Sequence, residues 1–356
     1  MTLAHLGYGA AIVLLAACLL VVLGLVAVRF GRDRAELRRN ALRAPVWREV
    51  MMLTTGEPDE VGDAYERLIP VTAAERAAIE DDAFALVPKL RGTARERLRQ
   101  VLREWGVADE AVRWTRSRSS VRRCRGLYRL GVLASQQADP TMRDAVLARL
   151  DDRDFAVRRT AMLALGSFPE AGVVEHLLNR AAREPRLRVD FLSSVDRVGA
   201  PAVPVLRRGL TRSVAETPGG DRRGFLAAEA LGLVGAVSAV PSLESAMEES
   251  SDELRLACIH ALGQLGASSS VVALSGPLGH HDPTVRRAAA ASLGLIGGSW
   301  AVPALTTVLY DVNVEVARAA ANALRRCGPG GQDVLASSPA PVAREVVALS
   351  ALGSMA

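Results

Sequence analysis

The chain has 356 residues, of which 49% are apolar and only 4% aromatic, and its formal net charge is +5. So few aromatic residues argue against a β-sandwich and favour closely packed helices rich in alanine, leucine and valine. None of the cysteines belongs to a CxxC pair, which excludes a zinc ribbon and a redox dithiol. We expect all four to be small apolar core residues: Cys18, Cys124, Cys258 and Cys327.

The first predicted element is an uncharged stretch from Tyr8 to Val28. It has about the twenty residues that an α-helix needs to cross a bilayer. Residues 29–48 then carry seven arginines against Asp33 and Glu36, and the positive-inside rule places such a flank in the cytoplasm. The sequence therefore predicts a transmembrane anchor over residues 1–31 of a single-pass inner-membrane protein, with the N-terminus outside and the rest in the cytoplasm.

Two other interpretations of this stretch are weaker. A cleaved signal peptide would begin with a basic region, but only His5 and the amino terminus precede the apolar run. Residues 15–18 (LAAC) look like a lipoprotein cleavage site, yet ten further apolar residues follow Cys18, where a lipoprotein would turn polar. We therefore favour a permanent anchor.

Residues 32–118 have helical spacing of apolar positions, interrupted by loop signals such as TTGEPDEVGD. Terminal units of repeat arrays are often atypical. We expect a juxtamembrane collar that ends in a degenerate capping repeat.

Residues 119–356 repeat themselves. A glycine recurs at Gly232, Gly263 and Gly294, and Arg325 holds the next equivalent position, each 31 residues apart. Less regular copies of this position precede and follow, at Gly131, Gly166 and Gly353. A fixed period in this range indicates a solenoid of helix pairs, each of which buries its apolar stripe only against its neighbours.

One unit shows the local logic of the repeat. Asp282 is a good N-cap and Pro283 suits the first helical turn, so DPTVRRAAAASLG is predicted to begin a helix. Val285 and Leu293 fall on its apolar face. Glycines after residue 293 end this helix, and Pro303 lies early in a second, antiparallel helix, VPALTTVL.

The repeated D-x-x-VRR-x-A-x-x-ALG-x-(I/L)G-x-x-x-AVPAL pattern resembles HEAT repeats of the short bacterial kind, also called lyase-type HEAT-like repeats. The resemblance covers residues 119–354. It implies an α-solenoid of antiparallel helix pairs. Together with the predicted anchor, it predicts an all-α fold with one N-terminal transmembrane helix before the solenoid, in a membrane-anchored bacterial member of this family. In related arrays the second helix of each pair lines the concave side, so we expect VPALTTVL there. The resemblance implies a binding scaffold more than any one activity.

The sequence lacks the residues of the known enzymes with this fold. Deoxyhypusine hydroxylase holds a di-iron centre with His-Glu pairs, whereas no histidine here precedes a glutamate, and Glu175-His176 has the reversed order. Bilin lyases share the repeats, but nothing else resembles a pigment site. His280, His281 and Asp282 invite a metal assignment, yet Asp282 is already explained as a cap. With no phosphate loop, HExxH or GxSxG motif, we expect no catalytic residue, cofactor or metal, and no enzyme.

The segment from Arg113 to Arg129, RWTRSRSSVRRCRGLYR, carries seven arginines and no acid. It is a candidate site for anionic lipid, a nucleotide-linked substrate or an acidic partner surface. A solvated helix face is the plainer alternative, and Trp114 and Tyr128 leave stacking on nucleic acid open. The candidate binding residues are Arg113, Arg116, Arg118, Arg122, Arg123 and Arg125.

These observations predict a membrane-tethered cytoplasmic scaffold that binds a protein partner. Tethering favours a partner that is itself in the membrane, and a polysaccharide-forming glycosyltransferase is our expectation by analogy. The alternatives are an adaptor that binds anionic lipid or nucleic acid through the basic segment, and a HEAT-like enzyme of lyase type. Anionic lipid headgroups are a second expected partner, whereas nucleic acid and a small-molecule substrate are not expected.

Overall fold

The computed structural model describes residues 2–135, 140–217 and 219–353, although most side chains before residue 36 and those of residues 350–353 lie outside the description. Every regular element in these ranges is a helix, which confirms the all-α class. The chain packs as two units, residues 1–110 and 111–356. The predicted divisions after residues 31 and 118 stay predictions.

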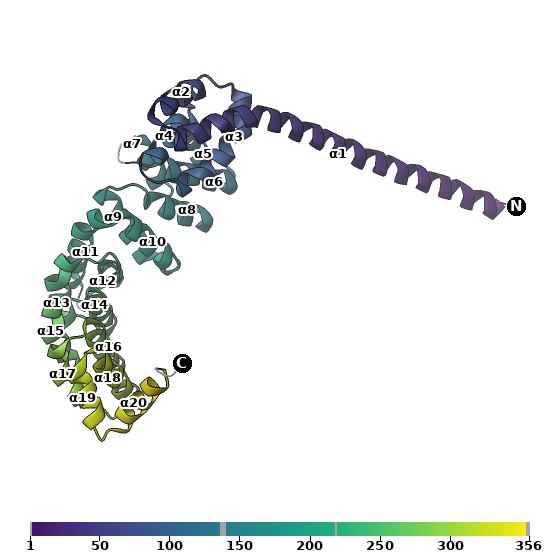
Figure 1. Cartoon of the computed structure of the whole chain (residues 1–356). Coiled ribbons are helices and arrows are strands. Elements are labelled where there is room, and N and C mark those ends of the chain that lie inside the picture. Colours follow the sequence, from purple (N-terminus) through teal and green to yellow (C-terminus); the bar gives the residue numbers. More distant parts are fainter. Residues whose placement is uncertain (1, 136–139, 218, 354–356) are drawn as a thin grey trace. The chain divides into compact units, whose positions relative to one another are not determined.

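The first unit packs around the C-terminal part of one long helix (Figure 1). Helix α1 (Thr2–Thr55) is followed by four shorter elements that pack against it or against each other, and these are α2 (Pro58–Leu68), α3 (Ala73–Leu86), η1 (Val87–Lys89) and α4 (Gly92–Glu104). Leu53, Leu68 and Leu98 are fully buried between them. The indole of Trp105 donates a hydrogen bond to the Leu68 carbonyl at 2.9 Å, which ties the end of this unit to α2.

The structure does not support the predicted membrane anchor. Tyr8–Val28 is part of α1 (Thr2–Thr55), a 54-residue helix that continues without a break into the arginine-rich residues. Most side chains of residues 8–28 lie outside the described residues. Of the helices described, none combines the length and the apolar character that a membrane crossing requires. This finding overturns the prediction of a single-pass inner-membrane protein.

The second unit is a two-layer array that follows α5 (Val107–Thr115), a helix that straddles the boundary. One layer holds the first helices of the pairs, which are α6 (Ser120–Leu133), α8 (Phe155–Leu165), α10 (Arg188–Val198), α12 (Arg222–Leu233), α14 (Asp252–Leu265), α16 (Pro283–Ile296), α18 (Val314–Arg326) and α20 (Pro341–Gly353). The other holds the second helices, which are α7 (Pro140–Leu147), α9 (Ala171–Arg183), α11 (Val203–Glu216), α13 (Val240–Glu249), α15 (Val271–Ser275), α17 (Val302–Val308) and α19 (Pro329–Ser337). Short 3-10 turns complete the connections, at η2 (Pro185–Leu187), η3 (Ala200–Ala202), η4 (Val237–Ala239), η5 (Ser268–Ser270), η6 (Gly276–Gly279) and η7 (Ser299–Ala301).

The predicted start of α16 is confirmed at the atomic level. The carboxylate of Asp282 accepts a hydrogen bond from the Thr284 amide at 2.8 Å, so it caps α16 as expected. Asn313 caps α18 in the same way, with its side-chain oxygen 2.9 Å from the Glu315 amide. Val285 is fully buried on the apolar face of α16.

The recurring glycines bring successive first helices together. A Cβ added at Gly263 would lie within 2.9 Å of the Ser292 Cα, and one at Gly294 within 2.7 Å of the Ala323 Cα. Helices of this layer therefore approach more closely than a larger residue would permit, and α12, α14, α16 and α18 make extensive contacts in sequence.

This close packing decides which layer lies inside the curve of the second unit. The more tightly spaced layer forms the shorter arc, and Figure 1 shows α12, α14, α16 and α18 on the inner side with α13, α15 and α17 outside. The expectation that VPALTTVL lines the concave side is therefore wrong, since this segment is α17.

Candidate partner-binding surface

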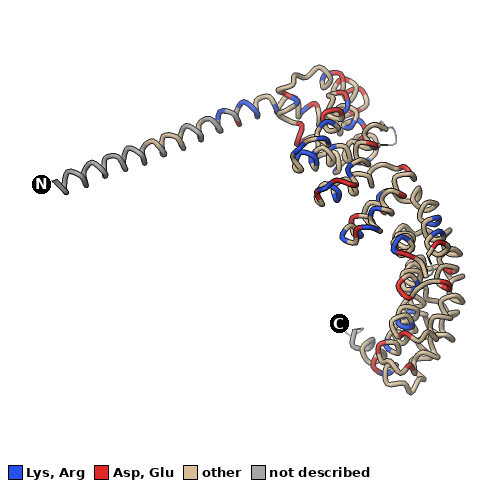
Figure 2. The backbone as a smooth tube through the Cα atoms, turned by 180° about the vertical axis from the view of Figure 1, so that it is seen from behind, with Lys and Arg blue, Asp and Glu red and all other residues tan. Residues whose placement is uncertain are grey.

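The predicted basic segment spans the end of α5, a short connection and the start of α6. Arg113 lies in α5, and the connection carries Arg116 and Arg118. The hydroxyl of Ser119 accepts a hydrogen bond from the Arg122 amide at 3.4 Å, so α6 begins in the middle of the segment. Arginine-bearing turns also recur along the first helices from α6 to α12 (Figure 2).

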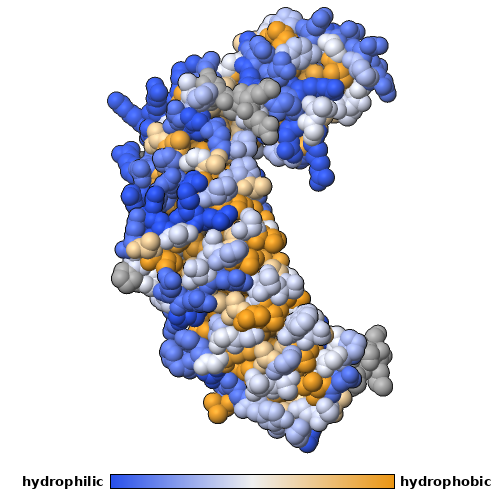
Figure 3. Space-filling model, turned by 90° about the vertical axis from the view of Figure 1, so that its left-hand side faces the viewer, coloured by the Kyte–Doolittle hydropathy of each residue, from blue (hydrophilic) through white to orange (hydrophobic). Residues whose placement is uncertain are grey.

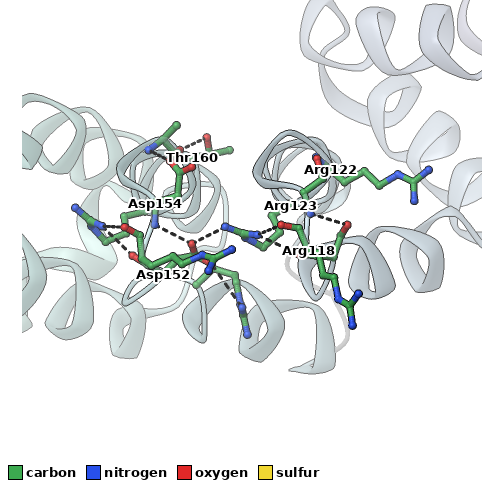
Figure 4. Close-up of polar contacts among 12 residues, drawn as sticks. Arg118, Arg122, Arg123, Asp152, Asp154 and Thr160 are labelled. Carbon is green, nitrogen blue, oxygen red and sulfur yellow. Dashed lines mark hydrogen bonds and ion pairs between the residues drawn. The ribbon is translucent and has the colours of Figure 1, made fainter.

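Arg123 is a structural residue and not a surface residue. Its side chain is 5% exposed and pairs with Asp152 at 2.9 Å. It also donates to the carbonyls of Ser117 and Arg118, each at 3.0 Å, so it closes the connection before α6 against the next repeat. Figure 4 shows Arg123 directed toward Asp152, whereas the Arg122 side chain points away from it.

The partner carboxylate of this pair is held in its charged form. Burial alone would raise the pKa of Asp152, but hydrogen bonds from the Asp154 amide and the Arg123 guanidinium outweigh it and hold the pKa below the usual range. The Asp152 carboxylate is therefore charged inside the array at neutral pH, and neither member of this buried pair is available to a ligand.

The same arrangement recurs in later repeats, which the sequence did not reveal. Arg158 in α8 donates to the carbonyls of Asp152 and Arg153 and pairs with Glu184 at 2.6 Å. Arg286 in α16 donates to the carbonyls before its own helix and pairs with Asp311 at 2.7 Å. The first arginine of the VRR motif in α8 and in α16 therefore forms an ion pair that joins one repeat to the next, which we call an inter-repeat clasp.

Arg125 and Arg129 are engaged with Trp114. The Arg125 guanidinium lies 5.2 Å from the centroid of the indole ring and that of Arg129 lies 4.3 Å from it. Arg129 is only 4% exposed. Such cation–π contacts occupy the aromatic face, which leaves Trp114 poorly placed to stack on a nucleic-acid base.

The four remaining arginines form an exposed group, which we call the N-terminal basic surface. Each has an exposed side chain, and none makes an ion pair with a residue that the structure describes: Arg113, Arg116, Arg118 and Arg122. Five of the six predicted binding residues thus lie at the surface, but only these four combine exposure with the lack of an acidic partner.

The histidine cluster does not form a convincing metal centre. Ligand atoms of Asp252, His280 and His281 lie within 4.8 Å of one another. The Arg255 guanidinium, however, lies 3.1 Å from His280 Nε2 and also pairs with Asp252. A cation at this point would meet a positive charge at close range, which opposes its binding.

A cavity of about 740 Å³ opens between α12 and α14 on the inner layer. Arg188 lines it, and its guanidinium pairs with Glu229 at 2.8 Å and lies 5.6 Å from the Phe225 ring centroid. Partial desolvation and the nearby Arg287 lower the pKa of His260 on its wall. Sequence reasoning missed this cavity, because its residues come from three separate helices and share no motif.

Comparison with known proteins supports the repeat assignment. A family model for HEAT repeats matches residues 240–325. No curated protein matches the chain significantly. The chain therefore carries HEAT repeats over the matched residues.

Several solved structures are similar. The CpcE–CpcF complex of phycocyanin lyase from Nostoc sp. PCC7120 is 22% identical, with 64% of this chain and 92% of that chain covered and a TM-score of 0.33. Human deoxyhypusine hydroxylase is 22% identical, with 75% and 98% covered and a TM-score of 0.31. An engineered protein is 20% identical, with 84% and 96% covered and a TM-score of 0.38.

These neighbours correct one prediction. We expected the chain not to be an enzyme, but the similar structures include a lyase complex and a hydroxylase. The prediction that the chain is not an enzyme is therefore wrong. The missing motifs exclude particular kinds of catalytic site, but they do not exclude every catalytic activity.

Proposed function

We propose that this chain is a HEAT-repeat scaffold that binds an acidic surface of a protein partner through the N-terminal basic surface. The observation that carries the proposal is the contrast within one short segment. Arg123 is buried in an ion pair, whereas Arg113, Arg116, Arg118 and Arg122 are exposed without an acidic partner among the described residues.

The energetics of this surface favour association with an anion. Like charges placed close together repel one another, and an acidic partner relieves that repulsion while it accelerates encounter. Arginine also matches carboxylates in two-pronged hydrogen bonds, so it provides orientation in addition to charge. The exposed arginines of the α5–α6 segment are therefore suited to a protein surface rich in aspartate and glutamate.

The array beside this surface supports a scaffold. Successive first helices form a continuous inner layer from α6 to α20, and repeats of this kind offer an extended binding surface. Nucleic acid is a weaker candidate, because Trp114 is already covered by two guanidinium groups.

The test compares full-length wild-type chain with a variant that carries Arg116→Glu, Arg118→Glu and Arg122→Glu. Arg123 is left intact, because its reversal would break a buried ion pair. The control carries Arg325→Glu and Arg326→Glu, two exposed adjacent arginines on α18. Partners that co-purify from the native cell are measured by quantitative mass spectrometry.

The proposal predicts a protein that co-purifies with the wild type and the control but is depleted at least tenfold with the triple variant. A set of co-purifying proteins that the triple variant retains in full would refute it.

A further inference from the structure

Helix α11 presents a basic face to the outside of the array. Its apolar side buries Val205, Leu206 and Leu210. The opposite side follows helical spacing and consists of Pro204, Arg207, Arg208, Thr211, Arg212 and Ala215.

This face forms one wall of a shallow groove of about 520 Å³, which Ser242 of α13 lines from the other side. The groove lining contains three arginines and no acid. Arg207 and Arg208 are exposed and pair with no described acidic residue. Arg212 is held loosely at the edge, 3.8 Å from Glu175 and 3.6 Å from Glu216.

The helices on the two sides of α11 differ in how they meet it. Toward α9, Gly209 brings the backbone so near that an added Cβ would lie 2.8 Å from Leu178 Cδ2. On the other side α13 has only 10 residues against the 14 of α11. The connection after α11 contacts the connection between α13 and α14, since the Ser251 amide donates a hydrogen bond to the Gly219 carbonyl at 2.8 Å. The basic face is therefore left partly uncovered.

The chemistry of the groove is mixed. Pro204, Ala215 and the methylene stems of the arginines make an apolar floor, while the guanidinium groups provide a charged rim. Figure 3, which views the outer layer, shows a hydrophilic surface toward its N-terminal half and a more apolar one toward its C-terminal half. A chain that alternates carboxylate and small apolar side chains would satisfy both the rim and the floor.

We infer that this groove binds an acidic, extended peptide segment of a partner protein. The inference rests on the proposed function and deepens it, because it adds a second contact at α11 and α13, separate from the N-terminal basic surface. Carboxylates of the segment pair with Arg207 and Arg208, and its apolar side chains lie against Pro204 and Ala215.

The test measures binding of a short fluorescein-labelled peptide of alternating glutamate and alanine or leucine to the full-length chain by fluorescence anisotropy. The groove variant carries Arg207→Glu and Arg208→Glu. The matched control is the Arg325→Glu, Arg326→Glu variant, which reverses the same number of adjacent charges elsewhere. Circular dichroism melting shows that each variant is folded before it is used.

The inference predicts binding that weakens with salt, falls at least tenfold in the groove variant and changes less than twofold in the control. It is overturned if the peptide does not bind at low salt, or if both variants lose binding equally. Tighter binding of a single-stranded oligonucleotide to the groove than of the peptide also overturns it.

The N-terminal triple variant separates this inference from the proposed function. Normal peptide binding by that variant supports the groove, whatever happens in the co-purification. Loss of peptide binding in the triple variant alone assigns the peptide to the N-terminal basic surface and refutes the groove.

Discussion

The clearest prediction concerns the buried ion pair between Arg123 and Asp152. Replacement of Arg123 by methionine fills a similar volume but leaves the Asp152 carboxylate, which is 5% exposed, with only the more distant Arg149, at 3.5 Å, as an ion-pair partner. It also removes the donors to the Ser117 and Arg118 carbonyls. The loss is therefore that of one member of a buried pair and not that of a surface contact.

The magnitude follows from this burial. Removal of one partner of a buried ion pair costs about 3–5 kcal/mol, because the other charge stays desolvated. The second variant, Arg123→Met with Asp152→Asn, keeps an acceptor for the Asp154 amide and removes the stranded charge. We expect it to recover about 1–3 kcal/mol relative to the sum of the single changes.

The assay is urea unfolding followed by circular dichroism, with the free energy of unfolding measured for the wild type, both single variants and the double variant. In Arg123→Met the pKa of Asp152 should rise, so the part of the stability that the wild type loses on acidification through this carboxyl should shrink or reverse. A loss below about 1 kcal/mol, which is typical of exposed ion pairs, would refute the reasoning. So would strictly additive effects in the double variant.

Three further predictions test the packing and the charges of the array. Gly263→Ala should destabilise the chain by about 1–3 kcal/mol through overpacking, whereas Gly172→Ala in α9, where an added Cβ meets nothing within 4 Å, should stabilise it by about 0.4–1 kcal/mol; urea unfolding of both variants checks this pair, and equal effects would contradict it. Hydrogen bonds from Arg158 lower the pKa of Glu184 to about 2, so its contribution to stability is present above its ordinary value of 4.5 and is lost as the pH falls toward 2. Glu184→Gln should therefore flatten the stability profile across that interval, and an unchanged profile would count against the clasp. Asn313→Ala should cost about 1 kcal/mol through loss of the cap on α18, and Asn313→Asp should retain it; hydrogen exchange in the first turn of α18 distinguishes the two.

The repeat architecture could be predicted because its signals are local. The 31-residue recurrence of Gly232, Gly263 and Gly294 marks one face of each first helix, and the structure uses these positions for close approach. The cap at Asp282 followed from the residue type and its place before Pro283. Each of these features depends on a few neighbouring residues and on a period.

The errors arise where the outcome depends on distant contacts. Arg122 and Arg123 look alike in sequence, but only Arg123 folds back onto its own connection and meets Asp152 of the next repeat. The inner layer of the curve depends on the relative spacing of two helix layers, which no single unit reveals. The apolar stretch at residues 8–28 likewise does not reveal that the helix containing it extends to Thr55.

The central claim is that exposed arginines of the α5–α6 segment bind an acidic partner. The measurement that tests it most directly is the quantitative co-purification of full-length wild-type chain against the Arg116→Glu, Arg118→Glu, Arg122→Glu variant, with the Arg325→Glu, Arg326→Glu variant as control. The account predicts one protein that is retained by the wild type and the control and is depleted at least tenfold by the triple variant. Equal recovery of the co-purifying proteins with all three would contradict it.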